Sequence, residues 1–311
     1  MLRSCLLVAV LSGVAFADPP ATADEHAELT IRPTAKPFNH ITIENPLGDV
    51  RVEGHDAGTL RIEAFKHAPD TAALDRLHLQ LVPNPDGSVR LKASADPSRD
   101  KEAKPVPRSA VRVDLVIHAP RNVRVEASAS AGKLEIANMD AGGDLDTASG
   151  LISVRNVSGE LSTHSLTGPT SIAQVFGSID AQTITADMDL DSINGERLIA
   201  TVSHGKIAGR RIRSRHVELT SSDGMIVLEA EAALQGHLIV ATTKGDIDVR
   251  IRRHGALVVH ARGPNVNLGP QQKVLRDGVL EAQFGEIQNS AAPALVEMRS
   301  QLGTVKFGLL E

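Results

Sequence analysis

Hydrophobic and polar residues alternate along most of this chain, with the two-residue period that is typical of β-strands. Ile41-Thr-Ile43, Val50-Arg-Val52 and Val111 to Ile117 show the alternation clearly. Only two short stretches, Asp70 to Leu77 and Pro293 to Ser300, have the spacing of a helix, and each would form two turns at most. The pattern therefore predicts an all-β protein.

Turn residues separate the predicted strands in the first third of the chain. Pro83-Asn-Pro-Asp-Gly87 separates two alternating runs and predicts a hairpin. The charged, proline-containing stretch Ser98 to Pro107 predicts an exposed loop.

A repeat becomes visible from about Ser130 onward. A turn glycine is followed two residues later by Ile or Val. Successive turn glycines are 18 to 40 residues apart in sequence, and these distances fit a repeat unit of about 20 residues, with two enlarged units and one step that spans two units. Weaker turns lie between these glycines, so one unit is predicted to contain two strands and two corners. The predicted turn glycines, with Gly48 in an earlier turn, are Gly48, Gly150, Gly177, Gly205, Gly224, Gly245, Gly285 and Gly303.

The positions around the glycine predict the direction of the side chains. The residue two places after it is Ile or Val in all seven units and is expected to point inward. The residue before it has no shared chemistry and is expected at an outward corner, which includes Phe176 and Phe284. Glycine suits a corner that needs a positive φ or has no room for a Cβ. Stacked units of this kind predict a β-solenoid or an elongated two-sheet repeat with an N-terminal β-hairpin region, and a β-sandwich of ordinary hairpins is the alternative.

The N-terminus and the composition limit the possible functions. Arg3, a short apolar stretch and Ala15-Phe-Ala17 predict a signal peptide over residues 1–17, cleaved near Ala17. A polar leader (18–37) and a single domain (38–308) are expected to follow, with entry strands over 38–127 and regular coils from about 130 to 308. The one cysteine, Cys5, lies in the signal peptide, which excludes disulfides and cysteine chemistry from the mature chain.

Aromatic content and charge narrow the partners. The chain has no Trp, no Tyr and six Phe, so a sugar site built on stacked aromatic rings is excluded. The formal net charge of −5 does not favour nucleic acid. The sequence predicts no cofactor, no metal, no nucleic-acid partner and no transmembrane segment, and it leaves the oligomeric state open.

Three stretches together resemble a known family. They are Asn45-Pro-Leu-Gly-Asp-Val-Arg-Val-Glu-Gly54, the strand-proline-strand run from Val113 to Ser128, and the Gly-x-Ile ladder. Over about residues 38 to 308 the chain is similar to the bacterial putative-adhesin domain family, exported β-strand-repeat proteins of unknown function. The resemblance implies an exported β-repeat module, and it supplies no catalytic residue.

Asp187, Asp189 and Asp191 alternate with Met188 and Leu190. Such carboxylates could form a calcium site or act in glycoside chemistry. In a straight strand, however, alternate residues lie about 6.6 Å apart and do not converge on one ion, so an outward acidic ladder is favoured.

Arg210, Arg211 and Arg213 form the strongest basic patch, with Arg215 beside them. We expect them to stack beside Asp187 and Asp189 on a neighbouring rung. An anion or acidic-polysaccharide site is the alternative.

The sequence thus predicts an exported, non-enzymatic module, adhesin-like or associated with the periplasm or cell surface, whose ligand is undetermined. One alternative is a β-helix carbohydrate-active enzyme that uses Asp187, Asp189 or Asp191 with an arginine from 210–215. Another is a capped scaffold in which the part before Pro120 recognises the partner.

Overall fold

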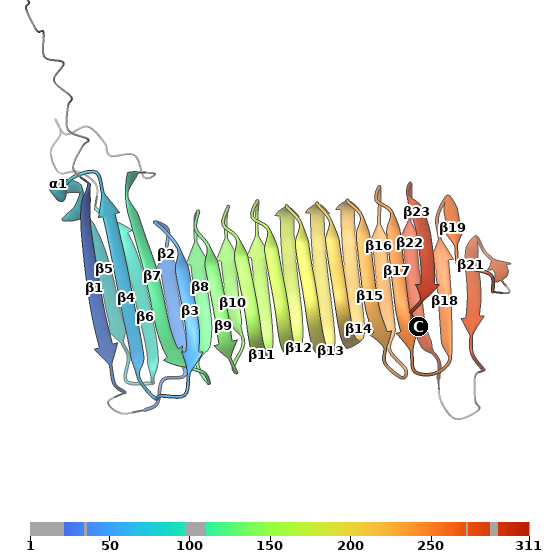
Figure 1. The fold of residues 1–311 in the computed structure, drawn as a ribbon, viewed down its shortest axis with the longest axis horizontal. Coiled ribbons are helices and arrows are strands. Elements are labelled where there is room, and N and C mark those ends of the chain that lie inside the picture. Colours follow the sequence, from blue (N-terminus) through green and yellow to red (C-terminus); the bar gives the residue numbers. More distant parts are fainter. Residues whose placement is uncertain (1–21, 34–35, 97–109, 272, 287–291, 311) are drawn as a thin grey trace, which may run out of the picture.

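The computed structural model describes residues 22–33, 36–96, 110–271, 273–286 and 292–310. The predicted signal peptide and the predicted loop Ser98–Pro107 lie outside the described residues. Within these residues, no helix is long and apolar enough to span a membrane. The chain is all-β, as predicted, and its strands stack side by side in an elongated body with two layers (Figure 1).

Layer A runs along one face of the stack. In spatial order its strands are β1 (Ala23–Ile31), β4 (Leu60–Ala68), β7 (Arg112–Pro120), β3 (Val50–His55), β9 (Leu134–Met139), the first parts of β11 (Ile152–Ser165), β12 (Thr170–Thr185), β13 (Met188–His204) and β14 (Ile207–Asp223), then β15 (Ile226–Ala232), β17 (Ile247–Arg253), β23 (Thr304–Leu309) and β19 (Asn265–Asn267).

Layer B covers the other face. Its strands are β5 (Leu77–Pro83), β6 (Ser88–Ala95), β2 (His40–Asn45), β8 (Arg124–Ala129), β10 (Gly143–Thr147), the second parts of β11 to β14, then β16 (His237–Thr242), β22 (Ala294–Ser300), β18 (Leu257–Arg262), β21 (Val279–Phe284) and β20 (Lys273–Arg276).

We call one strand segment in layer A together with the segment in layer B that directly precedes or follows it in the chain a coil. In the middle of the molecule each coil pairs in parallel with the next one along the chain. Ile152 lies opposite Leu134, and Thr170 lies opposite Ile152 in turn, so the same offset in sequence recurs. It lengthens only slightly further along, where Ile207 lies opposite Met188 and Ile247 opposite Ile226. The predicted repeat unit of about 20 residues, with two strands and two corners, is confirmed. The two enlarged units are wrong, because Gly177 lies at the opposite corner from Gly150 and Gly205 and the coils between them have the ordinary length.

The two ends of the stack depart from this simple succession. At the N-terminal end, β2 and β3 lie between β6–β7 on one side and β8–β9 on the other. At the C-terminal end, β22 and β23 lie between β16–β17 and β18–β19. A segment distant in sequence is therefore inserted near each end.

Antiparallel strands finish both layers at the N-terminal end and layer B at the C-terminal end, whereas layer A finishes there with the parallel strand β19. β1 pairs with β4 and β5 with β6, and the second pair forms the predicted hairpin, with Pro83 opposite Val89. The helix α1 (Thr71–Leu74), capped by the Asp70 side chain, confirms the first helix prediction. The second is wrong, because Ala294–Ser300 is β22, which alternates between buried and less buried side chains.

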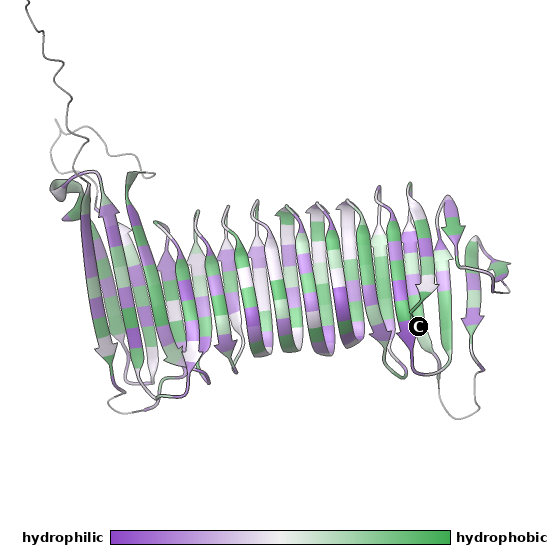
Figure 2. Cartoon of the chain, in the orientation of Figure 1, coloured by the Kyte–Doolittle hydropathy of each residue, from purple (hydrophilic) through white to green (hydrophobic). Residues whose placement is uncertain are grey.

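The core lies between the layers, and Figure 2 shows hydrophobic and hydrophilic residues alternating along the strands. The Ile or Val two places after each turn glycine is buried wherever the structure describes it, which confirms the inward stripe; these residues are Ile152, Ile179, Ile207, Ile226, Ile247 and Val305. Phe176 is 56% exposed, as predicted. The prediction for Phe284 is wrong: it is 6% exposed because its ring packs on Phe307, with ring centres 5.1 Å apart.

Strand β1 was not predicted, because residues 23–31 have the composition of a polar leader. Its charged residues are compatible with a strand because they pair across the register with β4. Lys66 Nζ lies 3.1 Å from Glu25 Oε1, and Arg61 Nε lies 2.8 Å from Glu28 Oε1. On the side toward the core, Ala23, Ala27, Leu29 and Ile31 keep the apolar alternation, which is interrupted only by Glu25 with its partner Lys66.

Close backbone contact explains the glycines at the corners. At the corner that leads from layer B back to layer A, a Cβ on Gly150 would lie 1.6 Å from the Gly132 carbonyl oxygen. A Cβ on Gly245 would lie 1.7 Å from the Gly224 oxygen. The opposite corner has its own column, in which a Cβ on Gly177 would lie 1.9 Å from the Gly159 oxygen. Adjacent rungs are about 4.8 Å apart, so neither backbone can yield enough to admit the atom.

A serine or threonine three residues before the glycine holds the first of these corners. The Gly150 N–H donates to Thr147 Oγ1 at 2.9 Å, and the Gly303 N–H donates to Ser300 Oγ at 2.8 Å. These hydroxyls point inward and are buried, so they satisfy backbone groups that water does not reach.

Candidate functional site

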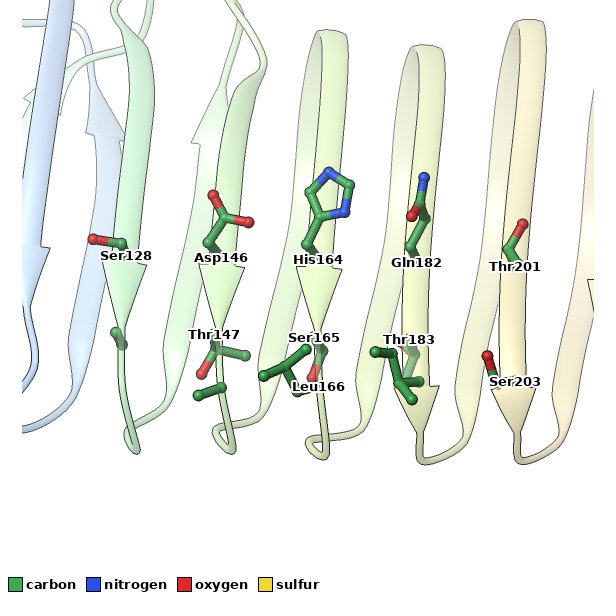
Figure 3. A pocket seen from close by; sticks show the side chains of 13 residues that line it. Ser128, Asp146, Thr147, His164, Ser165, Leu166, Gln182, Thr183, Thr201 and Ser203 are labelled. Atoms are coloured by element: carbon green, nitrogen blue, oxygen red, sulfur yellow. The ribbon is translucent and has the colours of Figure 1, made fainter.

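A groove of about 480 Å³ lies on layer B, beside the corners that lead back to layer A (Figure 3). It crosses five successive coils of the regular middle part. Two rows of side chains border it, one polar and one apolar, and both rows run along the stack, at right angles to the strands.

The polar row consists of side chains in register with one another. Ser128 lies opposite Asp146, Asp146 opposite His164, His164 opposite Gln182, and Gln182 opposite Thr201. All five occupy outward positions and are exposed, and Figure 3 shows them at one level on neighbouring strands. The row therefore presents one hydrogen-bonding group for each rung, with a repeat of about 4.8 Å.

The apolar row lies at the adjacent corners. It contains Ala148, Leu166 and Ile184, and Ser203 follows it on the next coil. Leu166 is 51% exposed and Ile184 49% exposed, although most Leu and Ile side chains of this chain are buried in the core. Two branched side chains side by side on the surface form a small apolar strip next to the polar row.

The floor of the groove is rigid. Thr147, Ser165 and Thr183 are the buried residues below it. The Ser165 hydroxyl accepts from the Gly168 N–H at 3.0 Å and donates to the Gly168 carbonyl at 2.7 Å, and the hydroxyls of Thr183 and Thr170 lie 3.2 Å apart. These bonds link the groove to the corners, so the rows are held in place before any ligand arrives.

The groove can hold an extended molecule that lies along the stack. Such a molecule would place hydrogen-bonding groups against the polar row and small apolar groups against Leu166 and Ile184. Among the described residues, no group of three His, Cys, Asp or Glu side chains is placed to hold a metal ion. What this geometry offers is a repeating binding surface.

The three predicted aspartates act separately. Asp187 Oδ1 accepts from the Lys206 backbone N–H of the next coil at 2.8 Å. Asp189 points outward from layer A between Ser171 and Ala208. Asp191 forms an ion pair with Arg211. The outward acidic ladder is thus used partly for backbone capping and partly for ion pairing.

The arginines pair across rungs, but with partners other than the predicted Asp187 and Asp189. The prediction is wrong because the register places Ala208 beside Asp189 and Arg210 beside Asp191. Arg211 has a φ of 53° and contacts Asp191 and Ser192, where its Nε donates to Ser192 Oγ at 2.8 Å. Arg213 reaches forward instead, with Nη2 2.8 Å from Glu231 Oε1.

Glu231 lies at the centre of a second group of charged side chains on layer A, which we call the charge ladder and which contains Arg213, Glu231 and His254. The side-chain hydrogen bond from Arg213 is the main reason why the pKa of Glu231 lies below its ordinary value. His254 also contacts it, at 3.4 Å. Because these groups lie on the open face of layer A, each pair is worth about 0–1 kcal/mol. The ion pairs link neighbouring coils, and Arg211 and Arg213 are both engaged in them.

The predicted turn glycines occupy both corners. Gly48, Gly150, Gly205, Gly224, Gly245 and Gly303 line the first corner, where Gly48 approaches the Val113 carbonyl. Gly177 belongs to the second, and Gly285 lies beside the Arg253 side chain. The groove residues were not predicted. The signal that could have found them is the constant spacing in sequence from Ser128 through Asp146 and His164 to Gln182.

The fold defines a class of protein: an elongated, two-layered, all-β repeat with a grooved outer face. No family model matches the sequence over any part of the chain, and no curated protein matches it. Solved structures do resemble it.

One similar structure is described as a putative lipid binding protein from Parabacteroides distasonis. It is 14% identical, with a TM-score of 0.50, and the match covers 93% of this chain and 97% of that one. A putative adhesin from Bacteroides fragilis is 14% identical, with a TM-score of 0.43 and coverage of 94% and 99%. A putative cell adhesion protein from Clostridium sporogenes is 9% identical, with a TM-score of 0.31 and coverage of 93% and 100%. The likeness at a TM-score of 0.50 concerns the fold. The names of the adhesins agree with the family that the sequence resembles.

Proposed function

We propose that the protein is an exported, non-enzymatic binding module, adhesin-like or envelope-associated, in which a β-solenoid scaffold presents the layer B groove to an extended ligand. The observation that supports this function is the polar row, kept in register over five coils, with the apolar row beside it on three of them. A catalytic centre brings a few groups to one point, whereas this surface repeats the same kind of contact along a line.

The spacing of the rows favours an N-acetylated glycan chain. An extended β-1,4-linked glycan advances by about one rung spacing for each sugar, so each sugar would lie beside one side chain of the polar row. Successive sugars are turned over relative to one another, so the apolar row offers a place for the acetyl methyl group of every second sugar, without an aromatic platform. The enzyme alternative is not favoured, because Asp187 and Asp191 are engaged with a backbone N–H and an arginine.

Direct binding measurements test this function. The probe is chitopentaose, a chain of five 1,4-linked N-acetylglucosamine units, titrated into the purified protein in a calorimeter. We expect Leu166→Asp and Gln182→Ala to weaken binding about tenfold or more, which corresponds to the loss of about 1.4 kcal/mol. Leu302→Asp is the matched control, since Leu302 is 69% exposed and lies outside the groove.

A lipid is the competing ligand, because the Parabacteroides distasonis protein is described as lipid-binding. The same variants are therefore tested in parallel for sedimentation with phospholipid vesicles. Chitopentaose binding that is equal in wild type, groove variants and control would contradict the proposed site. Binding to vesicles alone would contradict the glycan and favour the lipid.

A further inference from the structure

The N-terminal end of the stack carries two strand edges without a partner. Among the described residues, β1 pairs only with β4, and β5 pairs only with β6. Within the described part of the chain, these two strands are therefore the last strands of layers A and B, and neither has a strand paired on its outer edge, although α1 contacts β1. Unpaired strand edges are templates for pairing with another chain.

An apolar cleft of about 360 Å³ lies between these two strands. Its walls include Leu29 from layer A with Leu79 and Leu81 from layer B, and its floor includes the buried Ile62 and Leu91. Leu29 is 49% exposed although its side chain faces the interlayer core. In the middle of the stack, the core side chains of each rung are covered by those of the next rung. Among the described residues, the core side chains of this last rung have no such cover.

The sequence of β1 is complementary to itself in an antiparallel arrangement. With Ala27 opposite its own counterpart in a second copy, His26 would lie opposite Glu28 and Asp24 opposite Thr30. A histidine and a glutamate that face each other across strands can form a hydrogen bond, and here they would do so beside Phe65, on which His26 stacks, and Arg61, which lies 2.8 Å from Glu28. Glu25 would lie opposite Leu29 and keeps its ion pair with Lys66, 3.1 Å away in its own chain.

The sequence of β5 has the same property around Gln80. Antiparallel pairing about this residue would place Leu79 opposite Leu81 of the second copy, and Leu81 opposite Leu79. His78 would face Val82. The two leucine pairs would then cover the apolar cleft from both sides.

A single twofold axis can relate both the two copies of β1 and the two copies of β5. In layer A, the register leads from Ala27 to Ala64, Leu115 and finally Val50. In layer B, it leads from Gln80 through Lys92 to Glu44. Glu44 and Val50 flank the single turn that joins β2 to β3, so Ala27 and Gln80 lie at about the same level along the strands.

We propose that two copies of this chain join end to end through β1 and β5, related by a twofold axis perpendicular to the layers. Layer A then continues into layer A of the second copy, and layer B into layer B. The contact is isologous, which is the commonest form of dimer, and it leaves the groove exposed on each copy.

Sedimentation and light scattering at micromolar concentration test the assembly. We expect the wild type to be a dimer and Leu79→Lys to be a monomer with an unchanged far-UV spectrum. Leu275→Lys is the matched control, because Leu275 is 71% exposed on β20 at the opposite end, and it should remain a dimer.

Cross-linking tests the register without relying on a disruptive variant. In a Cys5→Ser background, Gln80→Cys places one thiol opposite its counterpart, within the roughly 4.4–6.8 Å between Cα atoms that a disulfide needs. His78→Cys places the two thiols four residues apart, at about 13 Å. We expect mild oxidation to link the Gln80→Cys chains almost completely and the His78→Cys chains hardly at all.

Three results would overturn the proposal. The first is a wild-type protein that stays monomeric up to about 100 μM, because a specific interface of this kind should form a dimer below that concentration. The second is equal cross-linking of the two cysteine variants. The third is a monomer that carries an acyl chain detected by native mass spectrometry and lost in Leu79→Lys, which would make the cleft a lipid site.

Discussion

The middle of this molecule and its two ends are built by different rules. From β11 to β14, each coil pairs with the coils that directly precede and follow it in the chain, at a nearly constant offset in sequence. At the ends, the coil β2–β3 and the coil β22–β23 are inserted between partners that are distant in sequence. The middle is therefore a nearest-neighbour stack, while each end is held by a long-range insertion.

The difference shows where the stack gains cooperativity. A stack of near-identical coils can fray from its ends, since each coil contacts only its neighbours. An inserted coil cannot detach without separating the two coils that flank it. The insertions thus protect the ends, while the regular middle can carry variable outward residues, including the groove.

Removing one coil from each region is the strongest test of this comparison. Deletion of residues 294–311 takes away β22 and β23 and with them buried side chains such as Val296, Met298 and Phe307. Burial of each is worth about 1.5–3 kcal/mol, so we expect a loss on the order of 5–10 kcal/mol. Residues 237–267 should lose protection in hydrogen exchange.

Deletion of residues 152–169 is the matched change in the middle. It removes one full period, so Thr170 takes the place of Ile152 beside Leu134. We expect this shorter protein to stay folded and to unfold in one transition. Equal damage from the two deletions would remove the distinction between middle and ends.

Glycine substitutions give the next largest effect. Gly150→Ala forces a Cβ to within 1.6 Å of the Gly132 oxygen in the middle of the stack, and both backbones are fixed by their rungs. We expect a loss of about 3 kcal/mol in the free energy of unfolding, measured with denaturant. At Gly58, near the N-terminal end, a Cβ would meet nothing within 4 Å, so Gly58→Ala should cost under about 0.5 kcal/mol.

Local pattern was enough to predict the middle of the fold. Ile152, Ile207, Ile226 and Ile247 each follow a glycine at the same distance, which reveals the inward stripe and the period. The ends were harder, because what decides them is pairing with distant segments. Ala294–Ser300 has good helix formers, yet β16 and β18, which flank it, make it a strand.

The candidate site was less predictable than the fold. Asp187 and Arg213 attracted attention by their local charge, but the register between neighbouring coils gives them different partners. The groove depends on residues such as Asp146 and His164, which are inconspicuous in sequence and become neighbours only once the coils are aligned. A surface made by stacking has no local motif.

The corner hydroxyls provide a test of moderate size. Ser165→Ala leaves the buried N–H and carbonyl of Gly168 without their partner in the middle of the stack. We expect a loss of about 1–2 kcal/mol in unfolding free energy. Ser149→Ala is the control: Ser149 is exposed and its hydroxyl donates to the Ser130 carbonyl at 3.2 Å, so its loss should stay within about 0.5 kcal/mol.

The same position in the inserted N-terminal coil is Asn45, which sharpens the comparison. Asn45 is fully buried, and its amide donates to the carbonyl of Val113, 2.8 Å away, in the adjoining strand β7. A serine cannot reach that carbonyl, so we expect Asn45→Ser to cost about 1–3 kcal/mol in unfolding free energy, measured with denaturant. If Asn45→Ser were harmless, the long-range bond would have no role in fixing the insertion.

The smallest expected effect lies where the middle meets the C-terminal end, at Glu231 on β15. The hydrogen bond from Arg213 lowers the pKa of Glu231 in the folded protein below its ordinary value of 4.5. The folded state therefore gains stability from the ionised carboxylate above that value, and the gain is lost as the pH falls through the lowered pKa. Glu231→Gln should cost up to about 1 kcal/mol at pH 7, and the difference from wild type should vanish well below pH 4.5. Unfolding in urea at several pH values measures this difference, with Glu196→Gln, an exposed glutamate, as control. A difference that persisted unchanged at pH 3 would mean that Glu231 stabilises the stack by packing, and the charge ladder would not contribute to linking the coils there.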